Sequence, residues 1–205
     1  MKIFAIGMNY PLHNKELDGR AYKPLEPVVF TKPDSSLLKD GKPLFIPDDL
    51  GRIDYEAEIV VRICRLGKGI PAQFAHRYYD AATVGIDFTA RDLQAKLRSA
   101  GQPWDMCKGF DGAAAIGRWV PKEETGDLGR IGFSLNINGR TVQSGDTADM
   151  VFTIDEMIAH ISKHITLKTG DLLYTGTPAG IGPVSIGDRL EGFLGGEKVL
   201  DMECK

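Results

Sequence analysis

Cysteine is scarce in this sequence, and its cysteines are not paired. The three residues Cys64, Cys107 and Cys204 lie far apart and form no Cys-x-x-Cys pattern. This odd, widely spaced set excludes a disulfide framework and a cysteine-based zinc site, and indicates ordinary reduced thiols. Long apolar runs are also missing, and the first residues lead directly into a strand pattern without a signal peptide. We therefore expect a cytoplasmic protein.

An excess of positive charge is missing as well. Lysine and arginine total 25 against 28 acidic residues, for a net charge of −3. Such a balance supplies no basic field, so we expect neither nucleic acid nor a membrane as a partner. The chain shows no repeats, linkers or low-complexity tracts, and residues 1–205 are expected to form a single domain.

What the chain does contain is glycine (24) and proline (11) in numbers that indicate many turns and a β-rich fold. Apolar and alternating stretches predict strands over residues 2–8, 28–32, 53–63, 82–86, 116–120 and 132–138. Helices are predicted over 11–18, 72–78, from a capping box at 89–92 to about 99, and from a second capping box at 153–156 to about 164. A loop is predicted over 103–112, and Asn138-Gly139 predicts a type I′ hairpin.

Residues 53–63 alternate between apolar and polar positions, which places Asp54, Glu56 and Glu58 on one face of a strand. Two interpretations are open. The carboxylates form a solvated strand face, or Glu56 and Glu58 supply hard oxygen ligands to Mg²⁺ or a similar divalent ion.

A third carboxylate comes where the strand 82–86 ends and the next helix begins. Asp87 lies at this junction, and Arg91 and Gln94 are expected on the same helical face as Asp87. Lys108 falls in the irregular segment 103–112, a kind of loop that often lines a site. Taken alone, a single loop lysine is usually solvated.

Two further stretches carry weaker signals. His13 and Glu16 are spaced i and i+3 on the predicted helix 11–18, where the carboxylate can orient the imidazole as a general base, or simply form a surface contact. The Gly-Thr-Pro-x-Gly-x-Gly run at 176–182 lacks the lysine of a phosphate loop, but it offers backbone N–H groups and the Thr177 hydroxyl to a small anion.

Six separate motifs, in this order, make the chain resemble the fumarylacetoacetate hydrolase family in its short form. They are Gly7-Met8-Asn9-Tyr10 with His13-x-x-Glu16, Phe30-Thr31-Lys32-Pro33 with Ser35, Asp54-Tyr55-Glu56-Ala57-Glu58, Gly85 to Gln94, Lys108-Gly109-Phe110-Asp111, and Thr175-Gly176-Thr177-Pro178-x-Gly180-x-Gly182. One departure is Met8, which stands where relatives often carry arginine, so a substrate contact by that side chain is lost.

The resemblance implies an α+β, β-rich fold with a mixed β-roll or sandwich core and peripheral short helices, assembled as a homodimer. It also implies Mg²⁺ or Mn²⁺ as cofactor, with Glu56, Glu58 and Asp87 as the metal ligands. By the same resemblance the substrate is a small 2-oxo acid that chelates the cation, which stabilises an enolate formed at C3.

The remaining roles that the resemblance implies concern the substrate. Lys108 would lie beside the substrate oxygen at the metal, and His13 with Glu16 would form a catalytic dyad on a segment that closes over the substrate. Substrate binding would fall to Thr177 at the carboxylate and to Arg91 and Gln94 at the far end.

Several different reactions pass through this enolate, and the residues of the chain do not show which of these reactions the protein catalyses. We favour C–C bond hydrolysis of an acylpyruvate, with oxaloacetate decarboxylation or tautomerisation as companion or rival. An isomerase of 2-hydroxyhepta-2,4-diene-1,7-dioate is the first alternative. A non-catalytic metal-binding module, whose carboxylates only stabilise the fold, is the second.

Overall fold

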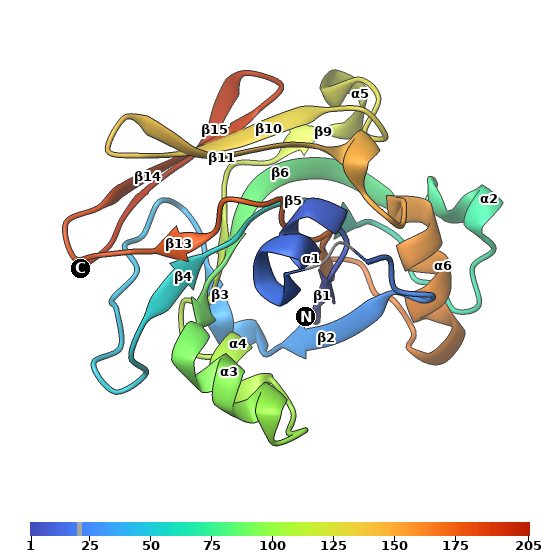
Figure 1. Cartoon of the computed structure of the whole chain (residues 1–205). Coiled ribbons are helices and arrows are strands. Elements are labelled where there is room, and N and C mark those ends of the chain that lie inside the picture. The colour runs from blue at the N-terminus through green and yellow to red at the C-terminus, as the bar shows by residue number, and fades with distance from the viewer. Residues whose placement is uncertain (20–21) are drawn as a thin grey trace.

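A curled eight-stranded sheet forms the centre of the computed structural model, which describes residues 1–19 and 22–205 (Figure 1). In spatial order its strands are β2 (Val28–Lys32), β1 (Ile3–Gly7), β12 (Leu172–Tyr174), β5 (Ala57–Ile63), β6 (Tyr79–Asp87), β8 (Ala114–Ile116) and β3 (Leu37–Leu38), with β9 (Val120–Pro121) paired to β6. The pairs β1–β12 and β3–β8 are parallel and the other neighbours antiparallel.

Two smaller sheets adjoin the large one. The first contains β11 (Arg140–Asp146), β10 (Gly132–Ile137), β14 (Arg189–Leu194) and β15 (Glu197–Glu203); the second contains β13 (Gly182–Pro183), β4 (Ile53–Tyr55) and β7 (Thr89–Ala90). Asn138 and Gly139 join β10 to β11 with φ values of 52° and 78°. Positive φ at both positions confirms the predicted type I′ turn.

Two chain segments pass from the large sheet into the small three-stranded sheet at the same place. The predicted strand 53–63 is two strands, β4 and β5, interrupted at Glu56, and β6 and β7 are interrupted at Phe88. The backbone N–H of Asp87 donates to the carbonyl of Glu56 over 2.8 Å, so the two breaks lie side by side. This corner between the sheets brings the acidic residues of both segments together.

The helices are short and lie at the periphery, as expected (Figure 1). They are α1 (Pro11–Asp18), α2 (Ala72–Ala75), α3 (Arg91–Ser99), α4 (Asp105–Lys108), α5 (Lys122–Thr125) and α6 (Ile154–His164), with single 3-10 turns at Asp34–Ser36 and Thr147–Asp149. The capping box of α6 is confirmed, since Thr153 and Glu156 each accept the other's backbone N–H. None of the helices in the described residues is long and apolar enough to cross a membrane.

The structure corrects four local predictions. The single strand predicted over 116–120 is wrong, because β8 ends at Ile116 and β9 begins only at Val120. The capping box at 89–92 is wrong, because Thr89 belongs to β7 and α3 begins after Ala90 without a side-chain cap. The segment predicted as a loop contains the one-turn helix α4, and α2 ends three residues before the predicted boundary. Tertiary packing decides these short elements, whose local signals are weak. The β-rich α+β class itself is confirmed.

Candidate active site

Three carboxylates meet at the corner between the sheets. One oxygen from each of Glu56, Glu58 and Asp87 lies within 4.8 Å of the others, and the three residues are only 5%, 2% and 1% exposed. The solvated-face interpretation of residues 53–63 is therefore wrong. Residues of both alternating sets are buried in β4 and β5, so these strands are covered on both faces. Three hard oxygen ligands at this spacing fit a divalent cation such as Mg²⁺ or Mn²⁺.

Three cationic side chains contact these carboxylates. Lys108 Nζ lies 2.8 Å from both Glu56 and Asp87, and Lys32 Nζ lies 2.6 Å from the other oxygen of Asp87. Arg91 donates from its guanidinium to Glu56. A buried carboxylate requires a counter-charge, and the nearby cations supply it to Glu56 and Asp87.

The surroundings shift the pKa values of Glu56 and Glu58 in opposite directions. Burial alone would raise the pKa of Glu56, but the charges of Lys108 and Arg91 outweigh burial and lower it below the ordinary value. Burial, together with the negative charge of Asp87, raises the pKa of Glu58 well above the ordinary value. Burial opposes the charge of Lys108, yet Asp87 and Glu56 prevail and raise the pKa of this amine to about 12.

Glu58 also connects the acidic cluster to the glycine-rich loop 175–182. Its Oε2 accepts the backbone N–H of Gly176 over 2.7 Å. Gly176 has φ of 101°, and a Cβ there would come within 2.7 Å of the Cβ of Asn9. Only glycine allows this close approach, which places Thr177 beside the carboxylates.

The predicted dyad is present on α1. Proline at the first position and the left-handed Gly19 (φ 72°) set the ends of this helix. His13 Nδ1 lies 3.3 Å from Glu16 Oε2, and the Glu16 carboxylate also accepts the Gly180 N–H at 3.2 and 3.3 Å. Burial would raise the pKa of Glu16, but these bonds from His13 and Gly180 lower it.

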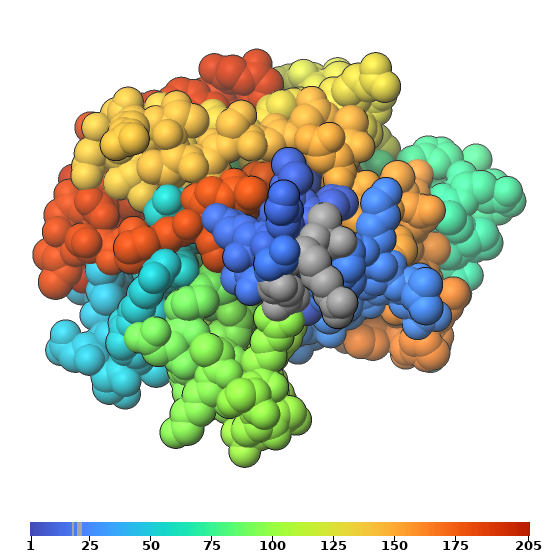
Figure 2. Space-filling model, in the orientation of Figure 1, coloured from blue at the N-terminus to red at the C-terminus, as the bar shows by residue number. Residues whose placement is uncertain are grey.

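One cavity joins eight of the nine predicted residues, and the ninth, Glu16, touches His13. The cavity measures about 40 Å³ and is lined by His13, Glu56, Glu58, Asp87, Arg91, Gln94, Lys108 and Thr177, among others. Figure 2 shows α1 on the surface at the centre of this face, between α3 and the β10–β11 hairpin. This volume holds an ion or a few water molecules. Admission of a larger molecule therefore requires α1 or the lining side chains to move.

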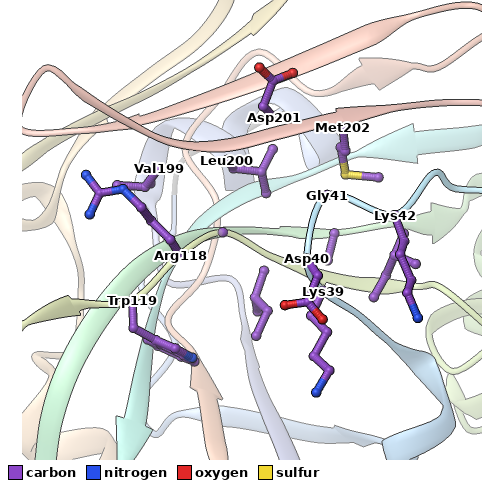
Figure 3. Close-up of a pocket in the computed structure, with 14 residues that line it drawn as sticks. Lys39, Asp40, Gly41, Lys42, Arg118, Trp119, Val199, Leu200, Asp201 and Met202 are labelled. Atoms are coloured by element: carbon purple, nitrogen blue, oxygen red, sulfur yellow. The ribbon is translucent and has the colours of Figure 1, made fainter.

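Larger hollows exist elsewhere, but they lack this chemistry. The hollow in Figure 3 measures about 340 Å³ and lies between the turn 39–42, the segment 115–119 and residues 199–202 of β15. Its charged side chains, such as Lys42 and Arg118, are exposed, and none of the buried polar residues described in the structure lines it. The small acidic cavity is the better candidate for a reaction site.

Comparison with known proteins agrees with this geometry. The family model described as fumarylacetoacetate (FAA) hydrolase, C-terminal, matches residues 2–202. The chain belongs to this family. The Escherichia coli protein named oxaloacetate tautomerase YcgM is 40% identical over 190 residues, which cover 92% of this chain and 86% of that protein.

Solved structures of the fumarylacetoacetate hydrolase family share the fold. A family member from Yersinia pestis matches with a TM-score of 0.95 at 37% identity, covering 100% of this chain and 93% of that one. The fumarylpyruvate hydrolase of Pseudomonas aeruginosa, solved with Mn²⁺ and pyruvate, matches with a TM-score of 0.93 at 31% identity, covering 100% and 89%. The chain is therefore an enzyme of the family, and the non-catalytic alternative is set aside.

Two expectations about the site need correction. Asp87 is the last residue of β6, separated from α3 by β7, so it does not share a helical face with Arg91 and Gln94; the three meet only through the cavity. Asp54 belongs neither to the ligand group nor to the cavity lining, and its carboxylate binds Arg52 (2.6 Å) and Arg91 (2.8 Å).

Sequence reasoning also missed residues that support the site. Lys32 and Gln143 are both buried and bonded to site residues. Lys32 carried a signal, since it lies in the Phe-Thr-Lys-Pro motif. Gln143 had none, because it sits in an ordinary hairpin strand far from every motif.

Proposed function

We propose that this enzyme acts on a small 2-oxo acid with Mg²⁺ or Mn²⁺ as cofactor, and that enol–keto exchange of oxaloacetate is its main reaction. One observation supports this most directly. The acidic cluster shares a single small cavity with a cation, a hydroxyl and an imidazole, contributed by Lys108, Thr177 and His13. The relative named oxaloacetate tautomerase and the neighbour solved with Mn²⁺ and pyruvate agree with it.

Glu56, Glu58 and Asp87 are the residues that would hold the cation. When bound, the cation would supply positive charge that polarises the carboxylate and 2-oxo oxygens of the substrate. Each of these carboxylate oxygens has more than one lone pair. The bonds from Lys108, Arg91 and the backbone therefore orient the ligands without exhausting them.

The chain's own groups then bind and orient the substrate. Thr177, with the amides of its loop, would hold the substrate carboxylate. Lys108 remains protonated at neutral pH because its pKa is raised, so its ammonium would stabilise negative charge that develops on the 2-oxo oxygen. Arg91 and Gln94 would bind the second carboxylate of oxaloacetate at the far end of the cavity.

His13 would move the proton. Its Nδ1 contacts Glu16, which leaves Nε2 to exchange a proton with C3 of the substrate while Glu16 stabilises the imidazolium form. In the direction from keto to enol, one proton leaves C3 and one is added to the 2-oxo oxygen. The number of protons on the substrate does not change, and no water is consumed.

Hydrolysis of an acylpyruvate is the second candidate. The Glu16-supported His13 is equally suited to deprotonating a water molecule, and a neighbour in the family is named a fumarylpyruvate hydrolase. Hydrolysis needs room for an acyl group and an attacking water in addition to the pyruvoyl group, and the relative named oxaloacetate tautomerase favours the first candidate.

A panel of oxaloacetate, acetylpyruvate and fumarylpyruvate, each with Mg²⁺, with Mn²⁺ and with EDTA, tests the proposal. Enol–keto exchange is followed by the ultraviolet absorbance of the enol, and pyruvate release by a coupled dehydrogenase. We expect metal-dependent acceleration of oxaloacetate exchange without matching pyruvate release. Pyruvate release from an acylpyruvate, with no effect on oxaloacetate exchange, would establish the hydrolase instead.

Two expectations about the organisation of the protein remain proposals. A homodimer predicts a solution mass of twice the 22.4 kDa chain, measurable by light scattering during size-exclusion chromatography. The single-domain organisation predicts one cooperative thermal transition.

A further inference from the structure

A glutamine outside the cavity connects two parts of the site. Gln143 lies on β11, in the four-stranded sheet, and is 2% exposed. Its Oε1 accepts the backbone N–H of Ala57 over 2.8 Å, between the acidic residues Glu56 and Glu58. Its Nε2 donates to the hydroxyl of Thr177 and to the carbonyl of Pro178, each over 2.9 Å.

The orientation of the Gln143 amide is determined by these partners. The Ala57 N–H can only donate and the Pro178 carbonyl can only accept. A flipped amide would oppose donor to donor and acceptor to acceptor, leaving two buried backbone groups without a bond. The NH₂ group of Gln143 therefore faces Thr177, although Thr177 alone would accept either orientation.

This orientation determines what the Thr177 hydroxyl can do. Because Oγ1 accepts a hydrogen from Gln143, the hydroxyl proton must go to another acceptor. Among the contacts of the described residues, the acceptor recorded for it is the Pro178 carbonyl at 3.5 Å. That distance exceeds the 2.5–3.0 Å typical of hydroxyl donors, and the same carbonyl already receives Gln143. The proton is thus available to an acceptor in the cavity that Thr177 lines.

We propose that Gln143 is a positioning residue that sets the direction of the Thr177 hydroxyl, so that the site accepts a carboxylate and discriminates against a neutral donor such as an amide. The inference rests on the proposed function, because it assigns the substrate carboxylate to Thr177. It adds an element of specificity that the cavity-lining residues do not contain, since a threonine hydroxyl by itself both donates and accepts.

The test compares the dissociation constants of pyruvate and its neutral amide, pyruvamide, for the Mn²⁺-loaded enzyme by titration calorimetry. Gln143→Glu retains an acceptor for the Ala57 N–H. When the introduced carboxyl group is ionised, its second oxygen carries no proton that it could donate to Thr177. When the carboxyl group is protonated, its single proton goes to the Pro178 carbonyl. In both states the Thr177 hydroxyl donates toward residue 143 and turns its lone pairs to the cavity. We expect the preference for pyruvate over pyruvamide to fall by at least about tenfold, the scale of one charge-assisted hydrogen bond.

Two further variants separate this role from a purely structural one. Gln143→Met keeps the length of the side chain and removes its polarity, so the preference is expected to fall less than in Gln143→Glu. Thr177→Val removes the hydroxyl, and adding Gln143→Met to it should leave the preference unchanged, because Gln143 acts through that hydroxyl. Thr177→Ser is expected to retain the wild-type preference.

The outcomes are distinct. If the Gln143 variants weaken pyruvate and pyruvamide equally, or if Gln143→Met lowers the preference further in the Thr177→Val background, Gln143 only supports the fold and the inference is wrong. If the wild-type protein with Mn²⁺ binds no pyruvate at all, the proposed function fails, and the inference fails with it. Far-ultraviolet circular dichroism of each variant confirms that a folded protein was measured.

Discussion

Asp87 lies between two buried lysines, and this arrangement shows how single residues stabilise the acidic cluster. Lys108 reaches the cavity, whereas Lys32 does not line it and binds the far oxygen of Asp87. Lys32 also donates to the carbonyls of Lys108 and Ala113, so it holds the lysine-bearing turn and the carboxylate together. Burial lowers the pKa of Lys32 against the opposing effect of Asp87.

Replacing Lys32 should therefore cost stability. Lys32→Met leaves Asp87 with one fewer counter-charge in the interior, and we expect the free energy of unfolding to fall by about 3–5 kcal/mol, as when one partner of a buried pair is removed. Urea denaturation measures the change. Lys198→Met, which removes two ion pairs on the surface, is the control and should unfold like the wild type. Equal denaturation midpoints for the two variants would show that the Lys32 pair is not stabilising.

His13 allows a second prediction at this scale. His13→Ala should lower kcat by a factor on the order of 100 or more, because the proton-transfer group is lost, while Mn²⁺ affinity stays unchanged, because the acidic ligands remain. Steady-state kinetics and metal titration measure the two quantities. His164→Ala, at the exposed end of α6, should retain full turnover. A His13→Ala enzyme with normal kcat would refute the dyad.

At the scale of elements, α1 lies on the surface (Figure 2), lines the cavity with His13 and Leu17, and is connected to the glycine-rich loop through Glu16. The helix has eight residues, too few to be stable alone, so its position depends on such tertiary contacts. The small size of the cavity requires that α1 or the lining side chains move when a 2-oxo acid enters.

Removing the Glu16 contact should loosen α1. In Glu16→Ala the bonds to His13 and to the Gly180 N–H are lost, so hydrogen exchange of the α1 amides should accelerate. Lys15→Ala is the matched control, because it truncates an exposed side chain of the same helix. Mass-spectrometric exchange of residues 11–19 gives the result, and pyruvate with Mn²⁺ should slow exchange in the wild type. Identical exchange in all three proteins would contradict the role of Glu16.

At the scale of the whole molecule, the site exists because two strands pass between sheets at one corner. Glu56 and Phe88 mark the breaks, and the acidic residues at this corner are buried. The folded state therefore brings Asp87 to Glu56 and Glu58, which lie about 30 residues away in the chain, and a cation that binds all three stabilises the fold by mass action.

Metal addition should consequently raise the melting temperature. Free Mn²⁺ at one hundred times its dissociation constant would contribute about 2.7 kcal/mol. Glu58→Gln keeps an acceptor for the Gly176 N–H but removes a charged ligand, so the Mn²⁺-induced shift should largely disappear. Asp201→Asn, which changes a half-exposed carboxylate on β15, should leave the shift intact. Differential scanning calorimetry with and without EDTA measures it, and an equal shift in both variants would exclude the acidic cluster as the metal site.

The sequence by itself determined the local features, because those depend on neighbours within a few residues. The type I′ turn at Asn138-Gly139, the Thr153–Glu156 capping box and the His13–Glu16 spacing were all predictable from local patterns. Strand alternation offered Glu56 and Glu58 as candidate metal ligands, and the family resemblance favoured that role over a solvated face and added Asp87.

Only the tertiary structure decided which distant side chains touch. The contact of Lys32 with Asp87 joins positions 55 residues apart, and that of Gln143 with Thr177 joins positions 34 apart. Strand alternation distinguishes two faces but does not say whether both are covered, and for this reason the carboxylates of residues 53–63 looked as suited to water as to a metal. Burial and long-range pairing follow from how the sheets pack together, and no short stretch of sequence contains that information.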